Sequence, residues 1–504
     1  MISLSKSKYC NFWQCPKMEW LNRYKPEEKT EDSSLDAILM RGNEIGDLAM
    51  GLFGDYVEVT TYTDDKLDIS AMIRRTKEEL SKGTEIICEA SFSHNGLYCA
   101  VDILKKEDLG YAIYEVKSSS EDGNNPKPKA VYIADIAYQR YVLEKCGVNV
   151  TSTNLITLNK NYIRGEELDI QELFLIINVD DLVETEIKTV DLNLKKAENI
   201  LNSEDEPEFD ISERCRDPYD CQFWDYCTRD IPEQSVFDLY RMAFSKKLDL
   251  YRDGIIGYPN LLSSGRIANS TQIRQMEYAL HNKGTYIEKG NIKSFLDTLS
   301  YPLYFLDFET MQPAVPQFSG TKPYQQIPFQ YSLHYIEKED GEIKHKEFLA
   351  VSGEDPRRGI AEALCRDIPM DVCTTAYNKA FECTRLKELA DIFPDLAEHL
   401  LNIRNHIVDL LVPFQSGFYY NKAMGGSFSI KSVLPAIFPD DPELDYHNLE
   451  GVHNGSEAMN IFPQIQFMEP EEQEKARHNL LKYCELDTYA MVKVWQELVR
   501  VSEE

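Results

Sequence analysis

One short run of residues constrains the fold of this chain more than any other feature. Residues 303–310, Leu-Tyr-Phe-Leu-Asp-Phe-Glu-Thr, combine strand-forming side chains with two carboxylates, Asp307 and Glu309. Side chains two positions apart on a strand point to the same face, so these acids can share a cation while Leu306 and Phe308 point into the opposite layer. Carboxylate oxygens are ligands that suit Mg²⁺ or Mn²⁺. The run therefore predicts a strand that ends at a metal site.

Two later segments supply further groups for such a site. Residues 480–491 predict an amphipathic helix on which Tyr483 and Asp487 lie one turn apart and face the same way. Residues 375–382 predict a short apolar strand followed by a helix that begins near Glu382. Asp409, after another apolar segment, is an alternative to Glu382 as the third acid.

This order, an acid pair, then an acid, then Tyr-x-x-x-Asp, resembles the DEDDy subclass of the DnaQ-like exonucleases, which have an RNase H-like fold. The resemblance implies two divalent metal ions and an attacking water oriented by Tyr483. Paired ions stabilise the attacking and leaving oxygens of a phosphodiester cleavage. The implied metal ligands are Asp307, Glu309, Glu382 and Asp487. Glu382 stands where the family usually has Asp.

The amino-terminal half carries a second set of charged residues on a predicted hairpin. Residues 97–104 and 110–117 predict two strands joined by a polar turn. Asp102 lies near the end of the first strand, and Glu115 and Lys117 share one face of the second. Two acids beside an ammonium group suit metal-dependent phosphodiester hydrolysis, because the ammonium stabilises the charge that builds on the phosphate.

An Asp on one strand with Glu-x-Lys on its partner resembles the core of the PD-(D/E)XK nucleases. Tyr-Gln-x-Tyr around Gln139, on a predicted helix, resembles the RecB-type members. A predicted helix containing Glu44 resembles their first helix, where many relatives have a His ligand. Glu89 is a further candidate on a preceding strand. By this resemblance the metal ligands are Glu44, Asp102 and Glu115, and the catalytic residues are Lys117 and Gln139.

Four of the twelve cysteines form a third pattern. Cys215, Cys221 and Cys227 follow the spacing C-x5-C-x5-C, and Cys15 precedes the nuclease-like motifs, with Cys10 as a possible replacement for it. One cysteine before the core and three after it resemble the iron–sulfur staple of RecB-family and CRISPR-associated RecB-like nucleases, which implies a [4Fe–4S] cluster. A structural Zn²⁺ ion binds the same four thiolates, so a zinc site and cysteines without any ligand are alternatives to the iron–sulfur cluster.

Length and composition predict several parts. A chain of 504 residues with 43% hydrophobic content can fill two or more cores, so we expect an α/β multidomain protein. The expected parts are a RecB-like PD-(D/E)XK nuclease with its cysteines at 1–230, a helical connector at 231–298 and a DEDDy exonuclease-like domain at 299–504. No disulfide framework, apolar signal segment or membrane span is visible, which favours a reducing cytoplasm.

The net charge of −31 opposes binding to a polyphosphate, so we expect DNA to enter a confined groove or to be recruited by a protein partner. Together the motifs resemble a bacterial two-domain family that joins an iron–sulfur RecB-type nuclease to a DEDDy exonuclease-like domain. That resemblance implies a metal-dependent DNase, with a 3′-to-5′ exonuclease in the carboxy-terminal half, acting in DNA repair or against foreign DNA. The alternatives are an RNA substrate and a catalytically idle nucleic-acid-binding scaffold. The oligomeric state stays open.

Overall fold

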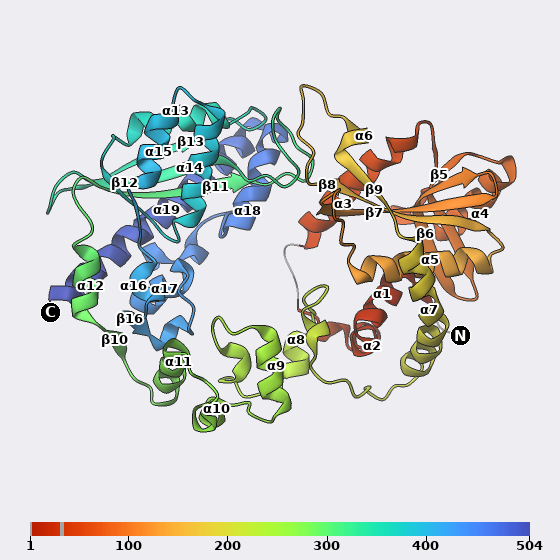
Figure 1. The fold of residues 1–504 in the computed structure, drawn as a ribbon, viewed down its shortest axis with the longest axis horizontal. Coiled ribbons are helices and arrows are strands. Elements are labelled where there is room, and N and C mark those ends of the chain that lie inside the picture. The colour runs from red at the N-terminus through yellow and green to blue at the C-terminus, as the bar shows by residue number, and fades with distance from the viewer. Residues whose placement is uncertain (1–2, 31–34, 504) are drawn as a thin grey trace. The chain divides into compact units, whose positions relative to one another are not determined.

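The computed structural model of the chain is a mixed α/β protein with two compact units, and it describes residues 3–30 and 35–503 (Figure 1). The first unit is Met1–Asp230 with Pro313–Gln325, and the second is Ile231–Gln312 with Gln326–Glu504. The expected connector, residues 231–298, therefore belongs to the second unit. Among the described residues, no helix combines the length and apolar character that crossing a bilayer requires.

A seven-stranded mixed sheet forms the centre of the first unit. Its strands follow the order β2-β5-β6-β7-β8-β9, and β1 pairs in parallel with β6 beside this path. Strands β5, β6 and β7 are antiparallel neighbours, whereas β7 and β8 are parallel. The strands are β1 (Leu4–Ser5), β2 (Val57–Glu58), β5 (Ile86–His94), β6 (Leu97–Glu107), β7 (Gly110–Glu121), β8 (Val150–Asn159) and β9 (Phe174–Asn178), with a separate pair β3 (Tyr62–Thr63) and β4 (Lys66–Leu67).

Helices cover both faces of this sheet. Side chains of β7 alternate between faces, so Ile113 packs in one apolar cluster with Ile136 of α5, while Tyr114 packs in another with Ile45 of α3. Residues on β7 of the same parity as Ile113 therefore face α5. The helices are α1 (Lys6–Gln14), α2 (Pro16–Tyr24), α3 (Leu35–Met50), α4 (Ile69–Lys82), α5 (Ala130–Lys145), α6 (Ile170–Leu173), α7 (Asp180–Leu201) and α8 (Trp224–Thr228).

The hairpin β6–β7 forms as the sequence predicts, with Glu107 opposite Gly110. Gly110 is required where β7 begins, because a Cβ atom there would lie 2.2 Å from the carbonyl oxygen of Asn149. The close approach brings β7 beside the start of β8, and the backbone N–H of Tyr111 donates to the same carbonyl at 2.9 Å.

Residues 313–325 complete the first unit from a distant part of the chain. The backbone of Arg164 exchanges hydrogen bonds with Thr321 and Gly320, at 3.0 and 2.8 Å, and the side chain of Arg164 donates to the carbonyl oxygen of Pro316 at 2.6 Å. Ala314 is buried in the apolar cluster beneath α3. The segment is therefore a packed part of the first unit.

The second unit has a five-stranded mixed sheet in the order β13-β12-β11-β14-β15. Strands β11, β12 and β13 are antiparallel, and β14 and β15 run parallel to β11. The strands are β11 (Leu303–Met311), β12 (Ile327–Ile336), β13 (Ile343–Leu349), β14 (Cys373–Ala376) and β15 (Ile407–Asp409), and β10 (Thr285–Ile287) pairs separately with β16 (Tyr419–Asn421).

The central strand β11 separates two apolar layers. Tyr304, Leu306 and Phe308 pack in the cluster that includes residues of α13, α14 and α15, whereas Leu303 and Phe305 pack with α19. The odd-numbered side chains of β11 therefore face α19. The helices are α9 (Phe244–Arg252), α10 (Tyr258–Ser264), α11 (Ser270–Leu280), α12 (Lys289–Leu296), α13 (Arg357–Asp367), α14 (Ala380–Ile392), α15 (Ala397–Asn405), α16 (Val412–Gln415), α17 (Ile430–Ile437), α18 (Gly455–Ile461) and α19 (Pro470–Glu503).

Candidate active sites

Three carboxylates meet between β11 and α19. Asp307 and Glu309 are the odd-numbered acids of β11, and Asp487 faces them from α19. One carboxylate oxygen from each residue lies within 4.8 Å of the other two. Strand alternation explains the first pair, and the long helix brings the third acid from the far end of the sequence. Oxygen ligands this close suit a divalent cation such as Mg²⁺ or Mn²⁺.

Glu382 is not one of the three carboxylates that lie within 4.8 Å of one another, but its charge contributes to raising the pKa of Asp307. It is buried in the first turn of α14, where one of its carboxylate oxygens has no hydrogen-bond partner among the described residues. Asp409, the alternative third acid, instead accepts hydrogen bonds from the backbone N–H groups of Asn378, Lys379 and Leu411, at 2.9, 3.2 and 3.0 Å. Of the two, Glu382 therefore keeps an oxygen available to a cation. We call Asp307, Glu309, Glu382 and Asp487 the acid cluster.

Burial and mutual repulsion favour the protonated forms of these acids. Burial, followed by the charges of its three partners, raises the pKa of Asp307 well above its ordinary value. Burial, with the charge of Asp487, raises the pKa of Glu309 to about 8, and burial raises that of Asp487 to about 6. Burial also raises the pKa of Glu382 to about 8. A cation would relieve this repulsion, because it favours the ionised carboxylates.

Two tyrosines and a lysine border the acid cluster. Tyr446 donates a hydrogen bond to Oδ1 of Asp487 at 2.6 Å, and its ring lies 6.0 Å from that of Tyr483. Lys431 donates to the hydroxyl of Tyr483 at 3.1 Å. Burial, and then the charge of Asp487, raises the pKa of Tyr483. The Tyr483 hydroxyl therefore keeps its proton at neutral pH and can donate a hydrogen bond.

The first unit brings Asp102, Lys117 and Gln139 together around Glu115, which is almost fully buried. Lys117 donates to Oε1 of Glu115 at 2.6 Å and to Asp135 at 2.8 Å. Gln139, on α5, donates to Oε2 of Glu115 at 2.7 Å and to Asp135 at 2.9 Å. Asp102 accepts the backbone N–H of Val116 at 2.7 Å.

Lys6 joins this group from the start of α1. Its ammonium lies 3.3 Å from Asp102 and 3.0 Å from Glu115, so it sits between the two carboxylates predicted to share a cation. We call the following set the Lys–acid network: Lys6, Asp102, Glu115, Lys117, Asp135 and Gln139. It contains four of the five residues that the sequence analysis assigned to this half.

Charges within the Lys–acid network oppose one another. Burial, and then the charges of Asp102 and Asp135, raises the pKa of Glu115 to about 7. Burial alone would raise the pKa of Asp135, but the ammonium groups of Lys117 and Lys6 hold it below its ordinary value. Burial favours neutral Lys117, yet the charges of Asp135 and Glu115 outweigh it and raise the pKa of that ammonium.

Glu44 and Glu89 occupy different positions from the network. Glu44 is exposed on α3, which packs on the face of β7 away from α5, and it is not among the described hydrogen-bond partners of the network. Glu89 precedes the residue paired with Val101 and has a φ of 57°, a left-handed conformation that costs a non-glycine residue free energy. Burial, and then the charge of Asp102, raises the pKa of Glu89 to about 7. Glu89 thus lies within electrostatic reach of Asp102.

Sequence reasoning missed Lys6, Asp135 and Tyr446. Lys6 follows a strand of only two residues, which pairs with β6 through Leu4 and Ser5 and gives no periodic signal. Asp135 lies one helical turn before Gln139, so the spacing of four on a predicted helix was the available signal. Tyr446 lies in a short 3-10 helix that is distant in the sequence from the strands of the sheet.

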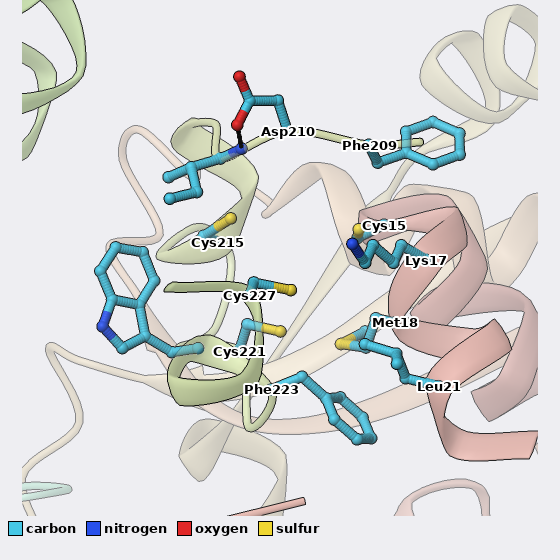
Figure 2. A pocket seen from close by; sticks show the side chains of 12 residues that line it. Cys15, Lys17, Met18, Leu21, Phe209, Asp210, Cys215, Cys221, Phe223 and Cys227 are labelled. Carbon is cyan, nitrogen blue, oxygen red and sulfur yellow. Dashed lines mark hydrogen bonds between the residues drawn. The ribbon is translucent and has the colours of Figure 1, made fainter. Parts of the chain in front are cut away.

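The four cysteines line one small cavity in the first unit (Figure 2). Cys15 precedes α2, Cys215 and Cys221 precede α8, and Cys227 lies within α8. In Figure 2 the sulfur atoms of Cys221 and Cys227 point toward the helix that bears Met18 and Leu21. The cavity is about 40 Å³ and is also lined by Met18, Leu21 and Phe223. We call Cys15, Cys215, Cys221 and Cys227 the cysteine group.

Electrostatics distinguish Cys15 from Cys10. Burial, and then the charges of the other three thiols, raises the pKa of Cys221 to about 11, and Cys15 is the first of those three. Cys10 instead lies within reach of Asp135 and Lys117 of the Lys–acid network. The structure therefore places Cys15 in the cysteine group.

The spacing of the sulfur atoms bears on what the cysteine group can bind. Within residues 3–30 and 35–503, no three of the four sulfur atoms lie within 4.8 Å of one another. Thiolates around a single zinc ion are about 3.8 Å apart, from a Zn–S bond of about 2.3 Å. Zinc would thus require the four thiols to move together, whereas a larger iron–sulfur cluster accepts wider spacing.

Comparisons with known proteins match part of the carboxy-terminal half of the chain to a protein-family model. Residues 304–429, which include three members of the acid cluster, match a domain of unknown function, DUF2779. An uncharacterized protein of Ureaplasma parvum serovar 3 is 25% identical over 248 residues, which cover 44% of this chain and 35% of that protein. An uncharacterized protein of Mycoplasma pneumoniae is 25% identical over 287 residues, 51% of this chain and 41% of that protein. The matches thus span less than half the length of these relatives.

Proposed function

We propose that this protein is a metal-dependent nuclease with two separate active sites that hydrolyse phosphodiester bonds in DNA. One observation carries the proposal: carboxylates of Asp307, Glu309 and Asp487, from a strand and a helix far apart in the sequence, lie within 4.8 Å of one another. Acids with raised pKa values that lie close together are typical of functional sites. The surrounding five-stranded mixed sheet supports the RNase H-like fold that the motifs imply.

In the second unit the acid cluster would hold a pair of Mg²⁺ or Mn²⁺ ions. Bound ions of this kind stabilise the attacking and leaving oxygens of a phosphodiester cleavage. The protonated hydroxyl of Tyr483 would orient the attacking water, and Lys431, 3.1 Å from that hydroxyl, would attract the phosphate. Tyr446 holds the carboxylate of Asp487 in place by its hydrogen bond. The resemblance to DEDDy exonucleases assigns this unit 3′-to-5′ removal of nucleotides.

In the first unit Asp102 and Glu115 would bind the metal. Gln139 fixes the Glu115 carboxylate through one oxygen, and Lys117 is placed to stabilise the negative charge on the phosphate. Lys6 lies where a cation would bridge the two acids, so it must move aside when metal binds. This arrangement supports the PD-(D/E)XK and RecB-like interpretation of the first unit.

The cysteine group would bind a [4Fe–4S] cluster as a structural staple. Four thiols line one cavity and come from the two ends of the first unit, so a cluster would join α2 to the segment around α8. The resemblance to the iron–sulfur staple of RecB-family nucleases favours this cluster over structural Zn²⁺.

A second candidate function is a catalytically idle scaffold that binds nucleic acid within a larger assembly. The net charge of −31 favours it, because binding to a polyphosphate depends on Lys and Arg contacts. An active enzyme with this charge would need a confined groove or a basic protein partner. The two candidates differ in whether the purified protein cleaves nucleic acid.

The test is degradation of end-labelled single- and double-stranded DNA and RNA with Mg²⁺ or Mn²⁺. We compare the wild type with Lys117→Ala and with the double variant Asp307→Ala and Glu309→Ala. Loss of a distinct subset of products in each variant supports two active sites, and the position of the label gives the polarity. A wild type that is inert on every substrate favours the scaffold. Cleavage that neither variant reduces refutes both proposed sites.

A further inference from the structure

A second group of potential metal ligands lies in the second unit, outside the acid cluster. His334 on β12, His345 on β13 and Glu485 on α19 each offer one ligand atom, and these atoms lie within 4.8 Å of one another. The two histidines are cross-strand partners, with ring centroids 4.5 Å apart. His334 is buried, and the other two are half-buried. We call these residues the His–His–Glu cluster.

One assignment of the hydrogen bonds around Thr488 places a single proton on each histidine ring. Thr488 Oγ1 donates its single proton to the carbonyl oxygen of Glu485 at 3.1 Å. The same oxygen lies 2.6 Å from Ser332 Oγ and 2.8 Å from His334 Nδ1, and in this assignment both of them donate to it. Ser332 has then used its proton and must accept from His345 Nε2, at 2.9 Å.

In this assignment both imidazoles are neutral, and each has a lone pair on its other nitrogen. That nitrogen is Nε2 in His334 and Nδ1 in His345. Metal-binding histidines have this arrangement, because the second ring nitrogen donates to a neighbouring oxygen and orients the ring. Burial, and then the charge of His345, lowers the pKa of His334 to about 4, which also favours the neutral ring.

We propose that the His–His–Glu cluster binds a divalent transition-metal ion, best matched by Zn²⁺, at a site separate from the acid cluster. Two imidazole nitrogens and one carboxylate are a common zinc ligand set, with water in the fourth position. Ligand atoms around zinc lie about 3.4 Å apart for bonds of about 2.05 Å, so small side-chain rotations would close the group.

The site would fasten three elements at one point. Its ligands come from β12, β13 and α19, and α19 also carries Tyr483 and Asp487 of the proposed exonuclease site. Glu485 lies between these two residues in sequence, on a different side of the helix. The metal would therefore fix the rotation of α19 without touching substrate.

The competing partner of Glu485 is Lys482, which donates to Oε2 at 2.6 Å one helical turn away. Its side chain is 53% exposed, and ion pairs of this kind contribute about 0.2–1 kcal/mol. Glu485 has a second carboxylate oxygen, so the ion pair and the metal need not exclude each other.

The test measures Zn²⁺ bound by untagged full-length protein after chelation and dialysis, using calorimetry and elemental analysis. We expect His345→Gln and Glu485→Gln each to bind one equivalent less than the wild type. His478→Gln, which changes an exposed histidine on the same helix, should bind as much as the wild type. Ser332→Ala, which removes the hydrogen bond to His345, should weaken that equivalent by about 10–100-fold.

Crystals of the protein soaked in Zn²⁺ give an independent readout. An anomalous peak between the two imidazoles and the Glu485 carboxylate supports the site. Equal stoichiometry in the wild type and both ligand variants, or a soaked crystal with zinc elsewhere but no peak here, overturns it. Neither measurement uses nucleic acid, so the result is independent of the proposed nuclease function.

Discussion

Replacing Asp307 by Asn should stabilise the metal-free protein while removing its response to metal. Unit charges 4.8 Å apart repel by about 3.5 kcal/mol at an effective dielectric constant near 20. Asp307 faces two such partners, Glu309 and Asp487. Protonation relieves part of this repulsion, because the pKa of Asp307 itself is raised well above its ordinary value and that of Glu309 is about 8. We therefore expect a gain of about 2 kcal/mol at pH 8, below the value for two ionised groups.

The assay is thermal unfolding at pH 8, in EDTA and then in Mg²⁺. A gain of about 2 kcal/mol corresponds to a rise of about 4–8 °C for a unit of this size. Hydrogen-exchange mass spectrometry on peptides from β11 and α19 assigns the change to the second unit. Mg²⁺ should raise the unfolding temperature of the wild type but leave Asp307→Asn unchanged, because one of the cation's ligands is lost.

Asp440→Asn is the matched control, since it removes one exposed carboxylate from the same unit. It should behave as the wild type in both buffers. A lower unfolding temperature for Asp307→Asn in EDTA would contradict the repulsion. A full Mg²⁺ response in that variant would contradict the shared cation site.

Four further outcomes are expected. Lys6→Met should lower the unfolding temperature of the first unit in EDTA, because Asp102 and Glu115 lose their shared ammonium. Mg²⁺ should restore the unfolding temperature, and a variant that Mg²⁺ does not stabilise would mean that a cation cannot replace Lys6. Tyr446→Phe should weaken Mn²⁺ binding to the acid cluster, measured by calorimetry, because a charge-assisted hydrogen bond of about 1.5–3 kcal/mol is lost. Unchanged affinity would show that the Tyr446 hydroxyl does not contribute to metal binding. Cys221→Ser, purified without oxygen, should lose the iron that the wild type and Cys10→Ser retain, and equal iron in all three would refute the cluster. Because the pKa of Glu309 is raised to about 8, its contribution to the stability of the metal-free protein is fully present below pH about 4.5 and is lost as the pH rises through about 8. Mg²⁺ affinity should rise over the same pH range. A stability in EDTA that does not change with pH would contradict the raised pKa.

The parts of the sites that lie on regular elements could be predicted from the sequence. Asp307 and Glu309 follow from strand alternation, and Tyr483 and Asp487 from helical spacing, because each pattern fixes which side chains share a face. The pairing of Glu115 with Lys117 follows in the same way.

Residues brought in by tertiary packing could not be predicted. The His–His–Glu cluster depends on the register between β12 and β13, which places His334 opposite His345, and on the rotation of α19. Neither quantity can be read from periodicity within one segment. The sequence places a boundary after residue 230, where the long segment of the first unit ends, but it gives no sign that residues 313–325 return to that unit.

The discontinuity of the first unit affects the order in which the chain can fold during synthesis. Its apolar cluster beneath α3 includes Ala314, so that core is incomplete when Asp230 leaves the ribosome. The strand that carries Asp307 and Glu309 is translated before the missing segment, at roughly 5–20 residues per second. The nascent first unit therefore cannot complete its core until residues 313–325 emerge, and by then the synthesis of the second unit has begun. A fragment ending at Asp230 would keep that surface exposed permanently and should aggregate.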